Sequence, residues 1–183
     1  MVFCSLIRNF AEKRMKKCIL AIGYWSLVIG YYPSSIACQA QTFTLQRQTD
    51  SLYVLTLTTD STRNQWRLPY PVYRMETGDV DGNGTTEALV GVVKPTRFHP
   101  ETGRRLFIFK NYEGLVRPMW LGSKLGGTLQ DFHFRNGCVR SLETNAKGEY
   151  TVAEYHWSGF GVAFERYLVK NTDEAKARET FEQ

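Results

Sequence analysis

From residue 41 onward, short runs of alternating apolar and polar residues are separated by turn-forming residues, and helical periodicity is almost absent. Residues 42–46 and 52–57 alternate at period two on either side of Thr49-Asp50-Ser51, which predicts a hairpin. Asn136-Gly137 is the strongest short hairpin signal in the chain. Such runs recur at a spacing of roughly 8–12 residues, which predicts an all-β, antiparallel domain over residues 41–170.

Some runs also predict where a strand lies in its sheet. Residues 106–109 are apolar on both faces, which predicts a central strand that is covered on both sides. Pro118 predicts an edge strand or a bulge over residues 115–121. Residues 94–104 are polar and contain two prolines and a glycine, which predicts a loop. The charged segment 171–183 predicts a C-terminal tail that is a frayed helix or disordered.

The first 40 residues differ in composition from the rest of the chain. Residues 1–17 carry five basic side chains against the single acid Glu12, and an apolar run from Cys18 to about Tyr32 follows. A basic segment, an apolar segment and then small residues are typical of a secretory signal peptide. The alternative is a transmembrane anchor, for which the run is shorter than the roughly 18–20 residues required. The start codon of the protein would be that of Met1 or that of Met15.

Cys38 lies at the end of this segment. Ser35 and Ala37 are small residues three and one positions before Cys38, which suits ordinary cleavage. Residues 36–38 also partly resemble a bacterial lipobox, which would make Cys38 a lipidated N-terminus, although Ser35 stands where that motif usually has Leu. We therefore expect export to the periplasm or the exterior, either as a soluble protein or as an outer-membrane lipoprotein whose only membrane contact is the lipid at Cys38.

The charge and the cysteines exclude some classes of function. The chain has 23 Lys and Arg against 18 Asp and Glu. Residues 1–40 hold five of the bases and one of the acids, which leaves 18 against 17, a net charge of +1. A nearly neutral domain lacks the concentrated basic patch that binds nucleic acid, so no nucleic-acid partner is expected. Removal of the leader takes Cys4 and Cys18 with it, so Cys138 and Cys38 supply no disulfide framework.

The most specific motif is a loop over residues 79–87. Oxygen-bearing side chains occupy its first, third, fifth and ninth positions, and the seventh residue can add its backbone carbonyl. These positions are Asp79, Asp81, Asn83, Glu87 and, for the carbonyl, Thr85. Ca²⁺ takes six to eight oxygen ligands in a flexible geometry, which such a loop can supply together with water. The alternative is a turn between two strands whose acidic residues are merely solvated.

The residues after the loop distinguish two kinds of calcium loop. An EF-hand needs a bidentate Glu at position 12 and flanking helices, whereas position 12 here is Val90, inside an apolar, β-branched run. The loop instead resembles the calcium loop of FG-GAP or VCBS repeats, the blades of integrin-α-type β-propellers, in which D-x-D-G-x-G-x-x-[DE] leads straight into a strand. That resemblance implies Ca²⁺ as a structural cofactor, held by the five residues named above.

The resemblance also bears on the architecture. The motif occurs once, and one propeller blade takes four strands, so the chain has material for about two or three blades. The resemblance therefore implies propeller-blade-like sheets, arranged in a partial propeller or a compact sandwich. A closed propeller is not expected. Residues 105–110 and 117–123 further resemble segments of exported bacterial proteins.

Catalytic signatures are few. Serine-hydrolase, zinc-protease, Cys-x-x-Cys and phosphate-loop motifs are absent from the sequence. His99 shares its predicted loop with Arg97, Glu101 and Arg104, a set that suits anion binding or acid–base chemistry, or else an ordinary solvated loop. His133 and His156 lie in predicted strands beside aromatic residues, which favours a packed or edge position over a ligand role. Cys138 is expected to be a small buried hydrophobe.

Carboxylates supply the remaining candidates. Asp131, Glu143, Glu154 and Glu165 would suit glycoside hydrolysis if two of them lay roughly 5–10 Å apart. The sequence therefore leaves two main hypotheses open. The first is an exported, non-enzymatic β-domain with a structural Ca²⁺ loop that binds an envelope protein or glycan. The second is a small envelope hydrolase, acting on glycan or peptide, that uses carboxylates or His99 in an aromatic cleft. A purely structural lipoprotein anchored at Cys38 is a third.

Overall fold

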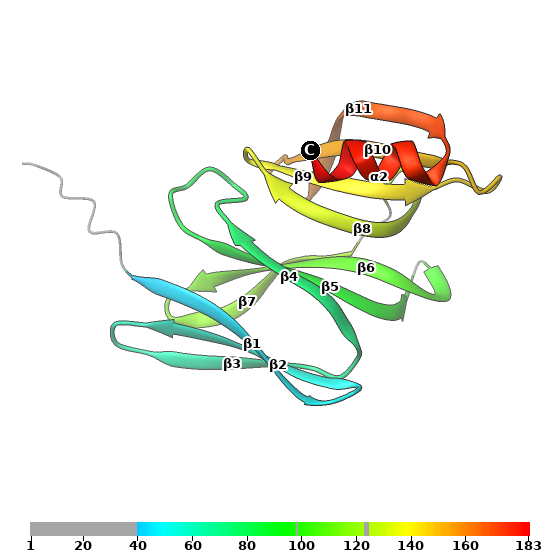
Figure 1. The fold of residues 1–183 in the computed structure, drawn as a ribbon. Helices are drawn as coiled ribbons and strands as arrows, with labels where there is room; N and C mark the ends of the chain where they lie inside the picture. The colour runs from blue at the N-terminus through cyan, green and yellow to red at the C-terminus, as the bar shows by residue number, and fades with distance from the viewer. Residues whose placement is uncertain (1–39, 98, 123–124) are drawn as a thin grey trace, which may run out of the picture. The chain divides into compact units, whose positions relative to one another are not determined.

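The computed structural model describes residues 40–97, 99–122 and 125–183. These residues form eleven β-strands in three antiparallel sheets, followed by one short helix (Figure 1). The prediction of an all-β, antiparallel domain is therefore confirmed. The predicted leader, residues 1–39, and the candidate lipidation residue Cys38 lie outside the described residues. Within the described part of the chain, no helix has the length and apolar character needed to cross a membrane.

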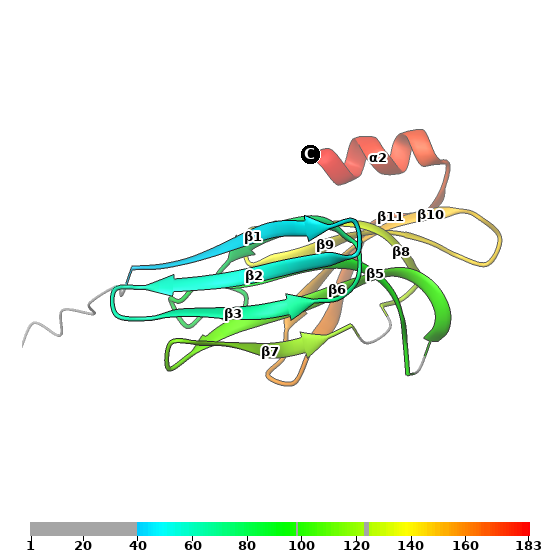
Figure 2. The same cartoon turned by 90° about the horizontal axis from the view of Figure 1, so that it is seen from below.

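The first sheet has three strands, and its middle strand pairs with both neighbours (Figure 2). The strands are β1 (Gln41–Thr49), β2 (Leu52–Thr59) and β3 (Arg63–Leu68). Phe43, Leu55 and Leu57 are buried in a cluster that also contains residues of the second sheet. The predicted hairpin at Thr49-Asp50-Ser51 is confirmed, because β1 and β2 pair across it.

The second sheet has the order β4-β5-β6-β7 and is covered on both faces. Its strands are β4 (Val72–Gly78), β5 (Glu87–Thr96), β6 (His99–Tyr112) and β7 (Leu115–Leu121). Along β6, Leu106 and Ile108 belong to one core cluster, whereas Phe107 and Phe109 belong to the other. The prediction of a central strand covered on both sides is confirmed. Pro118 lies on the edge strand β7, next to a shift in register, as predicted.

The third sheet has the order β11-β10-β9-β8. Its strands are β8 (Thr128–Arg135), β9 (Cys138–Thr144), β10 (Tyr150–Trp157) and β11 (Val162–Thr172). Leu129, Phe132 and Val139 share a core cluster with the second sheet. The hairpin predicted at Asn136-Gly137 is confirmed: both residues have positive φ, 52° and 77°, and the turn joins β8 to β9.

The chain ends in helix α2 (Glu174–Glu182), which packs on the third sheet. Asp173 caps its N-terminus by accepting a hydrogen bond from the Lys176 N–H. Ala177 and Phe181 lie one helical turn apart and are both 0 % exposed, in a cluster with strand residues of this sheet. The segment that the sequence left as a frayed helix or a disordered tail is therefore an ordered, docked helix.

The predicted loop over residues 94–104 is wrong. Strand β5 continues to Thr96 and β6 begins at His99, so this segment is the end of a long hairpin in which Lys94 pairs with Gly103. The side chains here are half-buried or exposed rather than alternately buried. A hairpin that extends past its covering sheets has no apolar face, so the period-two signal of a strand is lost.

Candidate metal centre

The loop of residues 79–86 joins β4 to β5 and is closed at its base by pairing between Gly78 and Glu87. Val80 points into the core shared by the second and third sheets and is only 4 % exposed. A Cβ on Gly78 would lie 2.2 Å from Cε1 of Phe134, so the chain approaches the third sheet too closely for any side chain there. The loop is thus fixed at its base and through Val80.

Three carboxylates converge in this loop. Asp79, Asp81 and Glu87 each offer a carboxylate oxygen, and these atoms lie within 4.8 Å of one another. Glu87 is 0 % exposed, whereas the two aspartates are half-buried. Among the residues that the structure describes, no Lys, Arg or His nitrogen lies within 4.0 Å of these carboxylates. Their mutual repulsion is therefore not balanced by a basic side chain.

The backbone of the loop is folded around Asp79. One carboxylate oxygen of Asp79 accepts a hydrogen bond from the Asn83 N–H at 3.0 Å, and the other accepts one from the Gly84 N–H at 2.8 Å. Asp81 accepts from the Asn83 N–H at 3.2 Å. Gly82 and Gly84 have φ of 73° and 83°, the left-handed region that glycine enters without strain. These turns hold the two aspartates in position.

Glu87 is tied to the loop by two hydrogen bonds. Its Oε2 accepts from the Val80 N–H at 2.8 Å, and its Oε1 lies 3.1 Å from the Thr85 hydroxyl, which shares its single hydrogen with the Asn83 side-chain oxygen at 2.6 Å. Burial raises the pKa of Glu87, and the negative charges of Asp81 and Asp79 raise it further. A carboxylate in such surroundings is stabilised in its ionised form by a bound cation.

The structure brings together three of the five predicted ligands as carboxylates. Asn83 lies in the same loop, but its side-chain oxygen accepts from the N–H and the hydroxyl of Thr85, at 2.7 and 2.6 Å. The sequence analysis missed Gln41, whose amide donates to the Thr86 carbonyl at 2.8 Å and ties β1 to the loop. It also missed Val80, although a single apolar residue inside a polar loop is a signal for an anchor.

Two of the four carboxylates proposed for hydrolysis are held by arginines. Asp131 accepts two hydrogen bonds from the Arg74 guanidinium, at 2.7 and 2.8 Å. Glu154 is 4 % exposed and lies between Arg140 at 3.0 Å and Arg166 at 2.7 Å. Burial opposes ionisation of Glu154, but the hydrogen bonds from Arg166 and Arg140 lower its pKa overall. Both carboxylates therefore have the surroundings of structural ion pairs.

The other two carboxylates also have hydrogen-bond donors. Glu143 is 2 % exposed and accepts from the hydroxyls of Ser141 and Tyr155, at 2.5 and 2.7 Å, and from the Gly127 N–H. Glu165 accepts from the Cys138 thiol at 3.2 Å. Cys138 is half-buried rather than buried as expected. Burial raises its pKa to about 11, and Glu165 adds to the shift, so this cysteine is a poor nucleophile.

The histidines occupy separate places. His133 Nδ1 lies 2.7 Å from Glu76 Oε1, and its ring stacks on Phe181 with centroids 4.6 Å apart, which confirms the predicted packing role. His156 is exposed on β10, an inner strand of the third sheet, so the packed or edge position predicted for it is wrong. His99 begins β6, and its side chain lies outside the described part of the chain.

No family model, curated protein or solved structure matches this chain. The resemblance to FG-GAP and VCBS loops thus stays a prediction carried by residues 79–87.

Proposed function

We propose that this chain is an exported, non-enzymatic β-domain whose loop over residues 79–87 holds a structural Ca²⁺, and that its surface binds an envelope protein or glycan. The observation that carries the calcium site is the set of three carboxylates within 4.8 Å, one of them fully buried and none paired with a basic side chain in the described chain. All the donors are oxygens, which suits a hard divalent cation.

A bound cation would link the two ends of the loop. Asp79 and Asp81 lie just after β4, whereas Glu87 is the first residue of β5, so one ion between them closes the turn. Ca²⁺ fits better than Mg²⁺ because Mg²⁺ demands a near-ideal octahedron and keeps most of its water. Extracellular calcium modules bind at roughly 10⁻⁴ to 10⁻³ M, so the site would fill outside the cytosol.

Exposed aromatic side chains support the binding role. Phe160 is 95 % exposed in the turn before β11, and Phe164 and Tyr167 on that strand are 48 % and 46 % exposed. Exposed aromatic side chains grouped on an edge strand and the turn before it are typical of an interaction surface. The arginine pairing of Asp131 and Glu154 weighs against hydrolysis, because a catalytic carboxylate pair must reach the substrate.

The calcium site is tested by thermal melts of the purified protein with 10 mM Ca²⁺ and with excess chelator. At this concentration, about 10 to 100 times the expected Kd, calcium stabilises the fold by about 1.4–2.7 kcal/mol. For a domain of this size the gain corresponds to a rise in Tm of about 5–10 °C.

Asp79→Asn and Asp81→Asn should abolish the calcium-dependent rise. Asp60→Asn is the matched control, because Asp60 is an exposed aspartate in the turn between β2 and β3. Identical melts of the unsubstituted protein with calcium and with chelator would refute the site, and an equal rise with Mg²⁺ would refute its selectivity.

A further inference from the structure

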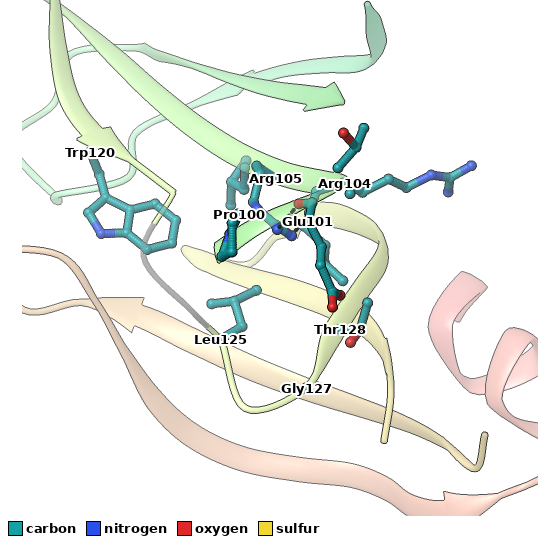
Figure 3. A pocket seen from close by; sticks show the side chains of 12 residues that line it. Pro100, Glu101, Arg104, Arg105, Trp120, Leu125, Gly127 and Thr128 are labelled. Atoms are coloured by element: carbon teal, nitrogen blue, oxygen red, sulfur yellow. Dashed lines mark hydrogen bonds between the residues drawn. The ribbon is translucent and has the colours of Figure 1, made fainter. Parts of the chain in front are cut away.

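A pocket of about 300 Å³ lies between the long β5–β6 hairpin and the segment that leads into β8 (Figure 3). One wall comes from residues 100–106, another from Trp120 of β7, and the floor from Leu125 and residues 127–129. This volume is at the lower end of the range for small-molecule sites, so the pocket suits one ring-sized group. It is separate from the carboxylate loop, whose residues do not line it.

Arg105 places a fixed positive charge in the wall of this pocket. Its guanidinium donates to the backbone carbonyls of Arg104 at 2.9 Å and Glu101 at 3.1 Å, which holds it in position. Its Nε is buried and has no hydrogen-bond partner. Among the described residues, no carboxylate oxygen lies within 4.0 Å of this guanidinium. No direct ion pair therefore holds this charge. Each terminal guanidinium nitrogen carries two hydrogens and makes one of these bonds, so each keeps one N–H for a ligand.

The neighbouring arginine does not supply a second charge at the same point. The Arg104 guanidinium donates to the Gln130 carbonyl and lies over the Tyr73 ring, 4.7 Å from its centroid. Figure 3 shows the Arg104 side chain extending away from Trp120, whereas Arg105 lies between Pro100 and Glu101. The pocket thus presents one cation, which matches a ligand with one negative charge.

The rest of the pocket combines apolar and polar surface. Trp120 and Leu125 are 9 % and 8 % exposed and form an apolar side. Figure 3 shows the Glu101 side chain directed toward Thr128, on the other side. A carboxylate and a hydroxyl there supply an acceptor and a donor for ligand hydroxyl groups. Flat apolar surface beside a few convergent polar groups is typical of a small-molecule site.

The floor is preformed by a buried network. Gly126 donates its N–H to the Tyr155 hydroxyl at 2.9 Å, and Gly127 donates its N–H to Glu143. Tyr155 in turn donates to Glu143 at 2.7 Å. A Cβ on Gly127 would lie 2.8 Å from the Thr144 carbonyl oxygen, so the close approach of this segment needs glycine. These contacts fix the floor before any ligand arrives.

We propose that the pocket binds a hexuronic acid residue of an acidic glycan. The sugar carboxylate would pair with Arg105, its hydroxyls with Glu101 and Thr128, and its apolar ring face with Trp120. Arginine suits a carboxylate because its fork of N–H groups matches the two oxygens. A phosphate ester carries nearly two charges and would face Glu101 with only one cation to balance them. This inference rests on the proposed function, which names an envelope protein or a glycan as partner, and it selects the glycan.

The test is titration of the purified protein with digalacturonate and with glucuronic acid, followed by calorimetry and by NMR. The neutral sugars galactose and glucose serve as ligand controls. We expect the uronates to bind and the neutral sugars to bind at least about tenfold more weakly, because they lack the charge-assisted pair. Binding should weaken as salt increases.

Arg105→Met keeps the apolar stem and should weaken uronate binding by about 10- to 100-fold. Arg105→Lys keeps the charge but not the fork of N–H groups, so its affinity for uronate should lie between those of the unsubstituted protein and Arg105→Met. This variant also tests the proposal if Arg105→Met does not fold. Arg67→Met removes an exposed arginine on β3 and should change nothing.

Three outcomes would overturn the assignment: no uronate binding by the unsubstituted protein, undiminished binding by Arg105→Met, or selective binding of inorganic phosphate. A peptide with a free C-terminal carboxylate that binds where uronates do not would also overturn it, in favour of a protein partner. The calcium melt is a separate readout. A normal calcium response with no uronate binding refutes the pocket alone, and uronate binding without a calcium response refutes the metal site alone.

Discussion

Substitution of Glu87 by Gln should change stability in opposite directions with and without calcium. Glu87 is fully buried, and its carboxylate lies within 4.8 Å of two others. Glutamine has nearly the same shape and can keep both hydrogen bonds. Its oxygen can accept from the Val80 N–H. Its amide can donate to the Thr85 hydroxyl oxygen, while that hydroxyl donates to the Asn83 side chain. The substitution therefore removes charge with little change in packing.

The size of the effect without metal follows from Coulomb's law. Two unit charges 4.8 Å apart repel by about 0.9–3.5 kcal/mol when the effective dielectric constant is roughly 20–80. The aspartates are half-buried, so solvent screens part of this repulsion, and we expect Glu87→Gln to stabilise the calcium-free protein by about 1–2 kcal/mol. Its Tm with chelator should therefore exceed that of the unsubstituted protein by about 4–8 °C. With 10 mM Ca²⁺ the unsubstituted protein should gain about 1.4–2.7 kcal/mol, and the variant almost nothing.

The pH dependence supplies an independent check. Burial and the neighbouring aspartates raise the pKa of Glu87 in the folded state. The folded state therefore binds this proton more tightly than the unfolded state, so the contribution to stability is present at low pH and is lost as pH rises through the folded pKa. Urea denaturation with chelator, between pH 5 and pH 8, should show this loss in the unsubstituted protein and not in Glu87→Gln. A variant that is less stable than the unsubstituted protein with chelator would refute the electrostatic reasoning.

Three further substitutions test the packing and the ion pairs. Phe181→Ala should reduce the free energy of unfolding by about 3–5 kcal/mol, because its ring is fully buried; a loss below about 1 kcal/mol in urea would show that α2 is not docked. Gly78→Ala places a methyl group 2.2 Å from the Phe134 ring and should cost about 1–3 kcal/mol. Adding Phe134→Leu should recover part of that loss, and simple additivity would contradict the steric explanation. Glu154 has a lowered pKa in the folded state, so its stabilising contribution is present above the unfolded pKa and is lost as pH falls through the folded value. Glu154→Gln should flatten this acid-side loss in melts between pH 3 and pH 6, and an unchanged profile would exclude the ion pairs as its source.

The strands that could be predicted from the sequence are those whose residues carry a local signal. Residues 106–109 are apolar at every position, and the structure divides their side chains between two core clusters. Asn136 and Gly137 tolerate positive φ, and the chain turns there. Residues 94–104 carry no such signal, because the hairpin extends beyond the sheets that would bury one of its faces.

The two candidate sites also differ in whether a local sequence motif predicts them. The carboxylate loop is local, since its ligands lie within nine residues, and the sequence was enough to place it. The Arg105 pocket is assembled from segments on either side of β7, and the ion pair between Arg74 and Asp131 spans 57 residues, so their contacts depend on how the sheets pack. Helix α2 had an available signal, the apolar pair Ala177 and Phe181 at a spacing of four residues, but two residues in a charged segment do not show that it is docked.

The two proposed sites should bind their ligands independently. Arg105 pairs with Val92 in the second sheet, five residues along β5 from Glu87, which is about 17 Å of strand. At that distance a divalent cation and a single charge interact by about 0.5 kcal/mol at the dielectric constant of water, and less after screening by salt. Calcium should therefore change the affinity for uronate by less than about twofold at temperatures where the protein is folded without metal, measured by calorimetry with Ca²⁺ and with chelator. A change of tenfold or more would mean that the loop and the hairpin switch together between two conformations, because direct electrostatics cannot supply it.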